Sequence, residues 1–263
     1  FEGGCYAKLI GLGEDKEPDI YHAIRPGAIV ENVQFYKGTN TINFDDASIT
    51  ENTRVSYPIH FISNAHETSI GGIPRNIFFL TCDAFGVLPP ISRLTSGQAM
   101  YQFMSGYTAK VAGTEAGVTE PKPTFSACFG APFLPLHPGR YAEMLGAKID
   151  QHKVNVWMVN TGWTGGPYGT GHRMKLAYTR SMITAALEGK LDNVATSRDP
   201  IFNLSIPQYV PGVPSEILNP QSTWSDQAAY TQKAKYLAGL FVKNFEKYAS
   251  CVSAEIREAA PRA

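Results

Sequence analysis

Hydrophobic and polar positions alternate in short segments along the first third of the chain. Residues 33–36, 41–44 and 55–59 each have the pattern of a strand, and the residues between them are typical of turns. A continuous apolar run then covers residues 77–82 and is followed by Asp83, a glycine and a Pro-Pro pair. Such a run predicts a buried strand that ends in a loop.

The pattern changes to a helical period after this loop. Apolar residues recur every three or four positions over 100–111, 138–149 and 230–248, which predicts one apolar helical face in each segment. The segment 178–187 is helical by composition, and residues 154–159 form a second apolar run. A helix followed by a buried strand implies an α/β architecture, with helices packed on a sheet.

Composition limits the classes of function. The chain has 263 residues, enough for one large domain or two small ones. Its 23 basic and 23 acidic residues cancel without any long basic run, so broad electrostatic binding to nucleic acid or to an anionic membrane is not expected. No apolar stretch reaches the roughly 20 residues of a membrane helix. The chain has four cysteines and no Cys-x-x-Cys motif, which indicates a reducing compartment. The cysteines are Cys5, Cys82, Cys128 and Cys251.

A glycine-rich segment, residues 160–173, lies between a predicted strand and a predicted helix. This order is typical of ligand-binding loops, because glycines allow the backbone to approach a ligand and to turn its N–H groups toward an anion. The spacing from Gly166 to His172 resembles a phosphate loop, but His172 and Arg173 occupy the positions of the defining Lys and Ser/Thr. We therefore expect a loop that borders a nucleotide base or ribose, with a surface loop as the alternative.

Three further residues carry candidate chemistry, each with an alternative. Lys8 follows two glycines and is placed to reach a phosphate or a carboxylate. Arg54 is suited to a bidentate pair with an anion, although a lone arginine more often forms a surface ion pair. Asp83, just past a predicted strand, is either a general base or metal ligand, or a cap of the following turn.

Several segments together resemble the carboxy-terminal half of ATP-dependent phosphoenolpyruvate carboxykinases. The segments that carry the resemblance are EGGCYAK (2–8), ENTRVSYPI (51–59), LTCDAFGVLPPISR (80–93), SGYTAKVAGTEAGVTEPKPTFSACF (105–129) and VNTGWTGG (159–166). The resemblance implies an α/β fold with a mixed-sheet nucleotide-binding domain and a small β-rich region. It divides the chain into residues 1–75, which are β-rich and supply an active-site Lys and Arg, and residues 76–263.

The resemblance also implies a reaction and its residues. Enzymes of this family convert oxaloacetate and ATP to phosphoenolpyruvate, ADP and CO₂, a step of gluconeogenesis. By motif position, Lys8 and Arg54 resemble catalytic residues, and Arg54 also resembles the contact to oxaloacetate and to the nucleotide phosphates. The remaining ATP contacts implied by the resemblance are Glu17, Arg173, Met174 and Thr179.

The family's phosphate loop, its aspartate-rich metal motif and its manganese-binding Lys and His are not found in the sequence. Mg²⁺ and Mn²⁺ are therefore expected to bind outside this chain, and the chain is expected to need a missing amino-terminal part for turnover. A cytoplasmic location is expected, with a peroxisome-like organelle as the other possibility. Two alternatives differ in class: a non-catalytic nucleotide-binding module, and a different small-molecule kinase.

Overall fold

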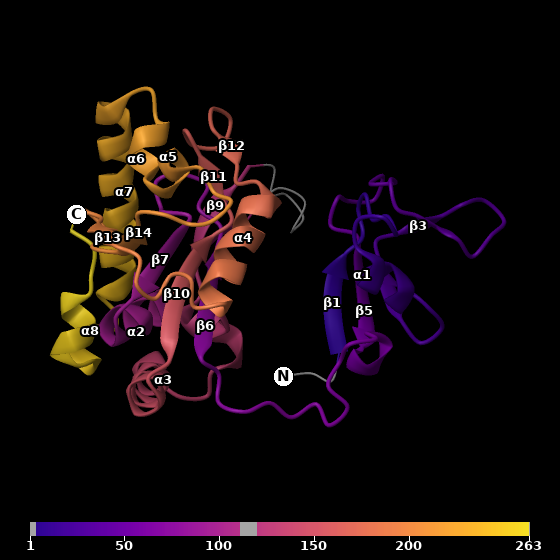
Figure 1. Ribbon diagram of the computed structural model, residues 1–263, viewed down its shortest axis with the longest axis horizontal. Coiled ribbons are helices and arrows are strands. Elements are labelled where there is room, and N and C mark those ends of the chain that lie inside the picture. Colours follow the sequence, from indigo (N-terminus) through magenta and orange to yellow (C-terminus); the bar gives the residue numbers. More distant parts are fainter. Residues whose placement is uncertain (1–3, 111–119, 263) are drawn as a thin grey trace. The chain divides into compact units, whose positions relative to one another are not determined.

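The computed structural model describes residues 4–110 and 120–262, which fall into two compact units (Figure 1). One unit comprises the described residues up to Gly72, and the other begins at Ile73. The sequence analysis places this division three residues later, between residues 75 and 76. Each unit has its own hydrophobic core, and each is described by itself.

The first unit is built on a three-stranded antiparallel sheet in the order β1-β5-β2. Its strands are β1 (Gly4–Lys8), β5 (Arg54–Pro58) and β2 (Ile29–Glu31). The smaller elements are α1 (Pro18–Ala23), the hairpin of β3 (Gln34–Phe35) and β4 (Ile42–Asn43), and the 3-10 turn η1 (Ile59–Phe61). One face of the sheet packs on a small core whose buried members are Leu9, Ala23, Val55 and Tyr57.

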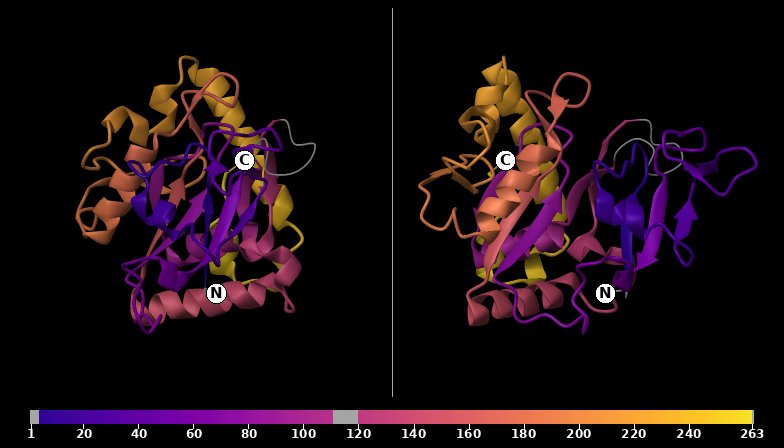
Figure 2. Two further views of the ribbon diagram at one scale, coloured as in Figure 1. Left: turned by 90° about the vertical axis from the view of Figure 1, so that its right-hand side faces the viewer. Right: turned by 45° about the vertical axis from the view of Figure 1, so that its right-hand side comes forward.

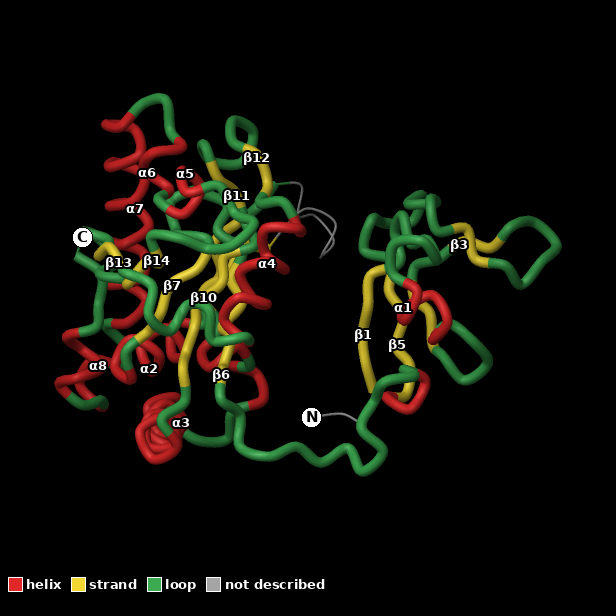
Figure 3. The backbone as a smooth tube through the Cα atoms, in the orientation of Figure 1, coloured by secondary structure: helices red, strands yellow, loops and turns green. Residues whose placement is uncertain are grey.

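The second unit contains a five-stranded mixed sheet in the order β13-β14-β7-β10-β6. Its strands are β6 (Asn76–Thr81), β7 (Ile91–Leu94), β10 (Asn155–Asn160), β13 (Thr196–Arg198) and β14 (Ser205–Pro207). β10 is parallel to β6 and antiparallel to β7, so the sheet is mixed. Figure 3 shows these strands between helices.

Helices cover both faces of this sheet, as the views of the second unit in Figure 2 show. The larger core packs one face against α2 (Ser96–Ser105), α3 (Pro138–His152), α7 (Gln227–Phe245) and α8 (Ala254–Glu258). The smaller core packs the other face against α4 (Leu176–Leu187) and α5 (Ser215–Leu218). Alternation along β10 explains the division, because Val156 and Met158 join one core while Trp157 and Val159 join the other.

The remaining elements are short. Two hairpins are formed by β8 (Tyr107–Lys110) with β9 (Lys122–Phe125), and by β11 (Trp163–Thr164) with β12 (His172–Arg173). The helical turns are α6 (Pro220–Thr223), η2 (Ala127–Phe129), η3 (Ala131–Phe133) and η4 (Ala249–Cys251). In the described part of the chain, no helix combines the length and apolarity needed to cross a bilayer.

Two predicted elements differ from the structure. The helix predicted over 100–111 ends at Ser105, because Gly106 has a positive φ of 52° and Tyr107 begins β8. Val111 of the same pattern lies outside the described residues. The strand predicted to be buried over 77–82 is β6, but it is the last strand of the sheet, and Leu80 is 56% exposed.

Candidate functional site

Lys8 and Arg54 lie directly opposite each other on β1 and β5. The antiparallel register pairs Lys8 with Arg54, and it pairs Arg54 with Glu31 on β2. Residues directly opposite in antiparallel strands project from the same face, with Cβ atoms about 5 Å apart. Val55 points into the core, so its neighbour Arg54 and the two paired residues project from the opposite, solvent-exposed face.

Glu31 is a member of this row that the sequence analysis did not identify. Its carboxylate oxygen Oε2 lies 2.6 Å from Nη2 of Arg54, and both side chains are about half exposed, at 47% and 45%. An ion pair with that exposure contributes little to stability. The pair does fix the direction of the Arg54 guanidinium, because Glu31 holds one edge of this planar group. A guanidinium has five N–H groups, so others remain for an anion.

Glu17 belongs to the same unit, at the residue before helix α1. It is half-buried, and its carbonyl accepts a hydrogen bond from the backbone N–H of Tyr21 at 3.0 Å. Its side chain does not cap the helix. The assignment of Glu17 as a nucleotide contact stays a prediction.

In the second unit, a buried amide joins the ends of β6 and β10. Asn160 is fully buried at the end of β10, and its Oδ1 accepts hydrogen bonds from the backbone N–H groups of Asp83 (3.0 Å) and Gly162 (2.8 Å). Its Nδ2 donates to the carbonyl of Leu88 at 3.0 Å. Ligands in α/β proteins commonly bind at the carboxyl ends of parallel strands, which is where this loop pair lies.

Asp83 caps the loop that follows β6. Its carboxylate accepts from the backbone N–H groups of Phe85, Val87 and Leu88 at 2.8–2.9 Å and from the hydroxyl of Tyr107 at 3.0 Å. Burial raises the pKa of the Asp83 carboxyl, and these four hydrogen bonds oppose that effect. Because Asp83 is fully buried with both oxygens engaged, it serves as the turn cap and not as a general base or metal ligand.

The glycines of the loop at residues 160–173 hold two loops together. A Cβ added to Gly162 would lie 2.1 Å from the carbonyl oxygen of Asp83, and one added to Gly86 would lie 2.2 Å from that of Gly166. The backbone N–H of Tyr168 in the loop 160–173 also donates a hydrogen bond to the carbonyl of Ala84 in the other loop, at 2.8 Å. The sequence predicted that these glycines allow a ligand to approach the backbone closely. At Gly162 and Gly86 the group that approaches is instead the backbone of the other loop, a contact that the linear sequence does not reveal.

Substitution of Gly162 by alanine tests this packing. The Cβ would meet three backbone atoms of Asp83 at 2.1–2.7 Å, and backbone cannot move aside as a flexible side chain does. We expect Gly162→Ala to destabilise the second unit by at least about 2 kcal/mol, measured by thermal unfolding. Gly239→Ala is the matched control, since no atom lies within 4 Å there and its place within helix α7 favours alanine. Equal stability of the two variants would contradict the packing.

A cavity of about 100 Å³ lies where β12 meets the start of α4. It is lined by Thr164, His172, Arg173, Met174, Lys175, Tyr178 and Ile217. This volume is below the about 300 Å³ of a typical ligand pocket, so it suits part of a ligand, such as one flat ring. Tyr178 offers an aromatic surface, and Ile217 comes from α5, which only the fold brings here.

Three predicted nucleotide contacts lie around this cavity or next to it. Arg173 and Met174 line it, while Thr179 is buried in the first turn of α4 and does not belong to the lining. Nε of Arg173 donates to the carbonyl of Thr161 at 3.2 Å, and its guanidinium carbon lies 5.4 Å from the ring centre of Trp163. The loop therefore holds the Arg173 side chain in a defined position.

A sequence model of the family described as Phosphoenolpyruvate carboxykinase matches residues 1–216. The chain belongs to the phosphoenolpyruvate carboxykinase family. This confirms the resemblance found from the motifs. The quoted segments fall on β1, on β5, on the end of β6 with the following loop and β7, on β8, β9 and η2, and on the end of β10 with β11. Residues 2, 3 and 111–119 of these segments lie outside the described residues.

Individual relatives agree with the family match, and each is named Phosphoenolpyruvate carboxykinase (ATP). The relative from Flavobacterium johnsoniae is 63% identical over 261 residues, covering 99% of this chain and 49% of its own length. The one from Thermus thermophilus is 58% identical over 263 residues, covering 100% and 50%. The one from Bacillus subtilis is 60% identical over 248 residues, covering 94% and 47%. The chain spans about half the length of the curated relatives it matches.

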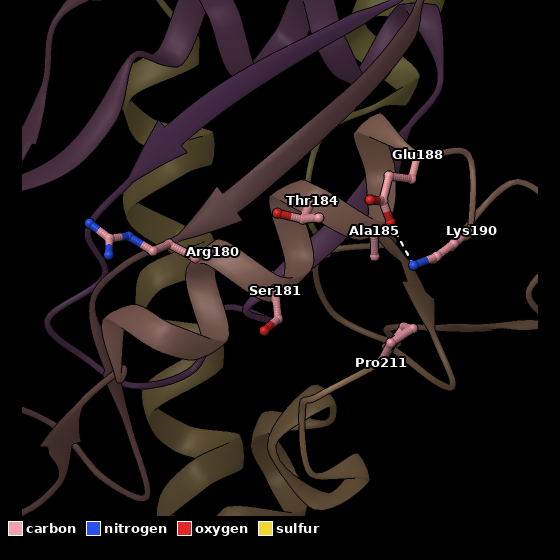
Figure 4. Close-up of a pocket in the computed structure, with 7 residues that line it drawn as sticks. All are labelled: Arg180, Ser181, Thr184, Ala185, Glu188, Lys190 and Pro211. Carbon is pink, nitrogen blue, oxygen red and sulfur yellow. Dashed lines mark ion pairs between the residues drawn. The ribbon is translucent and has the colours of Figure 1, made fainter. Parts of the chain in front are cut away.

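A second depression lies beside α4 and has a volume of about 240 Å³ (Figure 4). Its charged groups do not converge on a ligand. Nζ of Lys190 is paired with Glu188 at 2.6 Å, and Figure 4 shows Arg180 pointing away from both. We assign no role to this depression.

Groups of metal-ligating side chains are absent from the described residues. Within residues 4–110 and 120–262, no three His, Cys, Asp or Glu side chains are grouped as a metal site requires. None of the four cysteines, all within the described residues, forms a disulfide.

Proposed function

We propose that this chain forms about half of an ATP-dependent phosphoenolpyruvate carboxykinase. The proposed reaction converts oxaloacetate and ATP to phosphoenolpyruvate, ADP and CO₂. The observation that carries the proposal is the register of Lys8 with Arg54, which brings the two predicted catalytic cations together on one exposed sheet face. Family membership and the names of the relatives support the choice of substrates.

The proposed roles follow from the charges of the reaction. Loss of CO₂ breaks a carbon–carbon bond of oxaloacetate and leaves an enolate, whose oxygen then attacks the γ-phosphorus as ADP departs. Oxaloacetate, ATP and the enolate are all anions, so positioned cations are the main requirement. Lys8 would offset the charge on the enolate oxygen, and Arg54 would hold a carboxylate and a phosphate oxygen through the N–H groups that Glu31 leaves available.

The nucleotide base is proposed to bind at the cavity between β12 and α4. Arg173 and Met174 line the cavity, and Tyr178 adds an aromatic surface for stacking. Thr179 would support the wall from within α4, and Glu17 would contact ATP from the first unit. Mg²⁺ and Mn²⁺ are proposed to act in the whole enzyme, and no step is assigned to a metal on the described residues.

Loss of the Tyr178 ring tests the base site. We expect Tyr178→Leu, in a full-length carboxykinase containing this chain, to weaken ATP binding about tenfold, because a stacked ring contributes about 1–3 kcal/mol. Leucine keeps the contact that the Tyr178 side chain makes with the core beneath α4. Titration calorimetry with ATP is the measurement, and Tyr209→Leu, at an exposed tyrosine, is the control. Unchanged affinity would place the base elsewhere.

Removal of the Lys8 ammonium tests the reaction. We expect Lys8→Met to lower kcat for oxaloacetate-dependent and ATP-dependent CO₂ release about 100-fold in the full-length enzyme, because a positioned charge that stabilises the enolate is lost. ATP affinity should change much less. Lys37→Met removes another exposed lysine of the same unit and should leave kcat unchanged. ATP binding without any CO₂ release by the unsubstituted enzyme would instead favour the non-catalytic module.

A further inference from the structure

The sheet of the second unit ends at two edges of opposite character. β13 has three residues, Thr196 to Arg198, all exposed and one of them charged. Natural sheet edges are commonly short and charged in this way, which discourages pairing with another strand. β6 at the other edge has six residues without a charge, and four of its side chains, Ile77 to Leu80, are large and apolar. Continuous apolar runs are typical of strands whose two faces are both covered, and β6 has neither the charge nor the proline that would discourage a further strand from pairing at its edge.

Backbone geometry shows which groups of β6 face outward. The carbonyls of Arg75 and Thr81 accept hydrogen bonds from Asn155 and Thr161, at 2.9 Å and 2.8 Å. In a parallel strand the N–H and C=O of one residue point to the same side and alternate along the chain. Odd-numbered residues therefore face β10, and the backbone groups of Phe78 and Leu80 face away from it.

The outward edge is already paired at one end. The carbonyl of Cys82, the next even-numbered residue, accepts a hydrogen bond from Ala109 of β8 at 2.7 Å. On the amino-terminal side of Cys82, no described residue forms a hydrogen bond with the outward backbone groups of Asn76, Phe78 or Leu80. Among the described residues, a stretch of this edge as long as a short strand therefore has backbone donors and acceptors without a partner.

Exposed apolar surface accompanies the unpaired backbone. Leu80 is 56% exposed although it lies within the apolar run. The ring of Phe129 lies 5.8 Å from that of Phe79 and is itself 43% exposed. Exposed apolar side chains therefore lie at the edge of β6, where Leu80 stands, and beside Phe79, where Phe129 packs.

We propose that the outward edge of β6 pairs with a further β-strand, supplied by the half of the family's length that this chain does not span. The relatives are about twice as long as the region they share with this chain, so the family has polypeptide available for this role. Main-chain hydrogen bonds from Phe78 and Leu80 would hold the added strand, and the Leu80 side chain would become covered. The inference concerns assembly of the fold and does not depend on the proposed reaction.

Amide hydrogen exchange in a full-length carboxykinase containing this chain is the direct test. We expect the amides of Phe78 and Leu80 to exchange as slowly as those of Ile77 and Phe79, which face β10. Exchange of the outward pair at least about 100-fold faster than the inward pair would overturn the proposal. Protection that disappears on dilution would also overturn it, because the occupant would then be a second copy of the chain.

A proline substitution gives an independent test in the same protein. Leu80→Pro deletes an outward N–H, which an unpaired edge tolerates but a paired strand does not. We expect Leu80→Pro to lower Tm by at least about 5 °C more than Leu80→Ala, which removes the side chain and keeps the N–H. Phe79→Pro, which deletes an inward N–H, is the positive control. Equal Tm values for Leu80→Pro and Leu80→Ala would overturn the proposal.

Discussion

Replacement of Arg54 by lysine is expected to lower kcat/KM for oxaloacetate about 1,000-fold in a full-length carboxykinase containing this chain, a loss of about 4 kcal/mol of transition-state stabilisation. Lysine keeps the positive charge but loses the planar fork that holds two oxygens at once. It also loses the geometry set by Glu31, whose carboxylate lies 2.6 Å from Nη2 of Arg54. Initial rates of CO₂ release over a range of oxaloacetate concentrations are the measurement.

Two control variants make the Arg54 result specific. Arg140→Lys changes an exposed arginine of helix α3 in the second unit and should leave kcat/KM within a factor of about 2. Glu31→Gln removes the charge of the partner and should cost less than about tenfold, because the guanidinium itself is retained. An Arg54→Lys variant with nearly full activity would show that Arg54 only forms a surface ion pair.

Substitution of Asp83 by alanine is expected to destabilise the second unit by about 4–5 kcal/mol. The carboxylate accepts three backbone N–H groups and the hydroxyl of Tyr107 at a fully buried position. Alanine leaves these donors without partners where water does not replace them. Calorimetric unfolding of the full-length protein is the measurement, and a loss below about 1 kcal/mol would contradict the role of this cap.

A surface cap provides the matched control for Asp83. Asp226 accepts the backbone N–H groups of Ala228 and Ala229 at 2.8 Å and 2.9 Å, but in an exposed position. Asp226→Ala should cost only about 1 kcal/mol, because water satisfies the freed donors. Tyr107→Phe adds a further check: it should destabilise the wild type yet have little effect, or a favourable one, in the Asp83→Ala background.

The pKa of Asp83 also gives a sign for its pH dependence. Burial raises the pKa of this carboxyl in the folded protein above its ordinary value. A carboxyl with a raised folded pKa contributes most below its unfolded pKa, and that contribution is lost as the pH rises through the folded pKa. The destabilisation caused by Asp83→Ala should therefore be largest in acid and should decline as the pH rises.

Much of the fold was predictable from local patterns. The strands β3, β4 and β5 of the first unit, the apolar β10 and the helices α3, α4 and α7 follow from spacing that a strand or helix imposes on the sequence. The strands β1 and β2 and the helix α1 of the first unit were not predicted from that spacing. The predicted helix 100–111 extended too far, because Tyr107 continues the helical spacing although Gly106 adopts a left-handed conformation. The hydrophobic period of a sequence does not reveal a single residue, such as Gly106, whose left-handed backbone conformation ends a helix.

The candidate site was predictable only where motif and register coincide. Lys8 and Arg54 were found from segments that resemble a family, and β-pairing places them opposite each other. Glu31 and Ile217 lie far along the chain from their neighbours and have no motif, so only the tertiary fold identifies them. Asp83 showed the reverse: a carboxylate past a strand was compatible with chemistry, and burial assigns it to structure.

The pairing of β6 with β10 has a consequence for how the chain folds. Asn76 meets Asn155, so a long stretch of polypeptide must be arranged before this ladder forms. Contacts between residues distant in the chain slow folding, and the apolar β6 stays accessible to other molecules during that delay. Refolding yield should therefore fall with protein concentration, with aggregation beginning at the segment Asn76–Thr81.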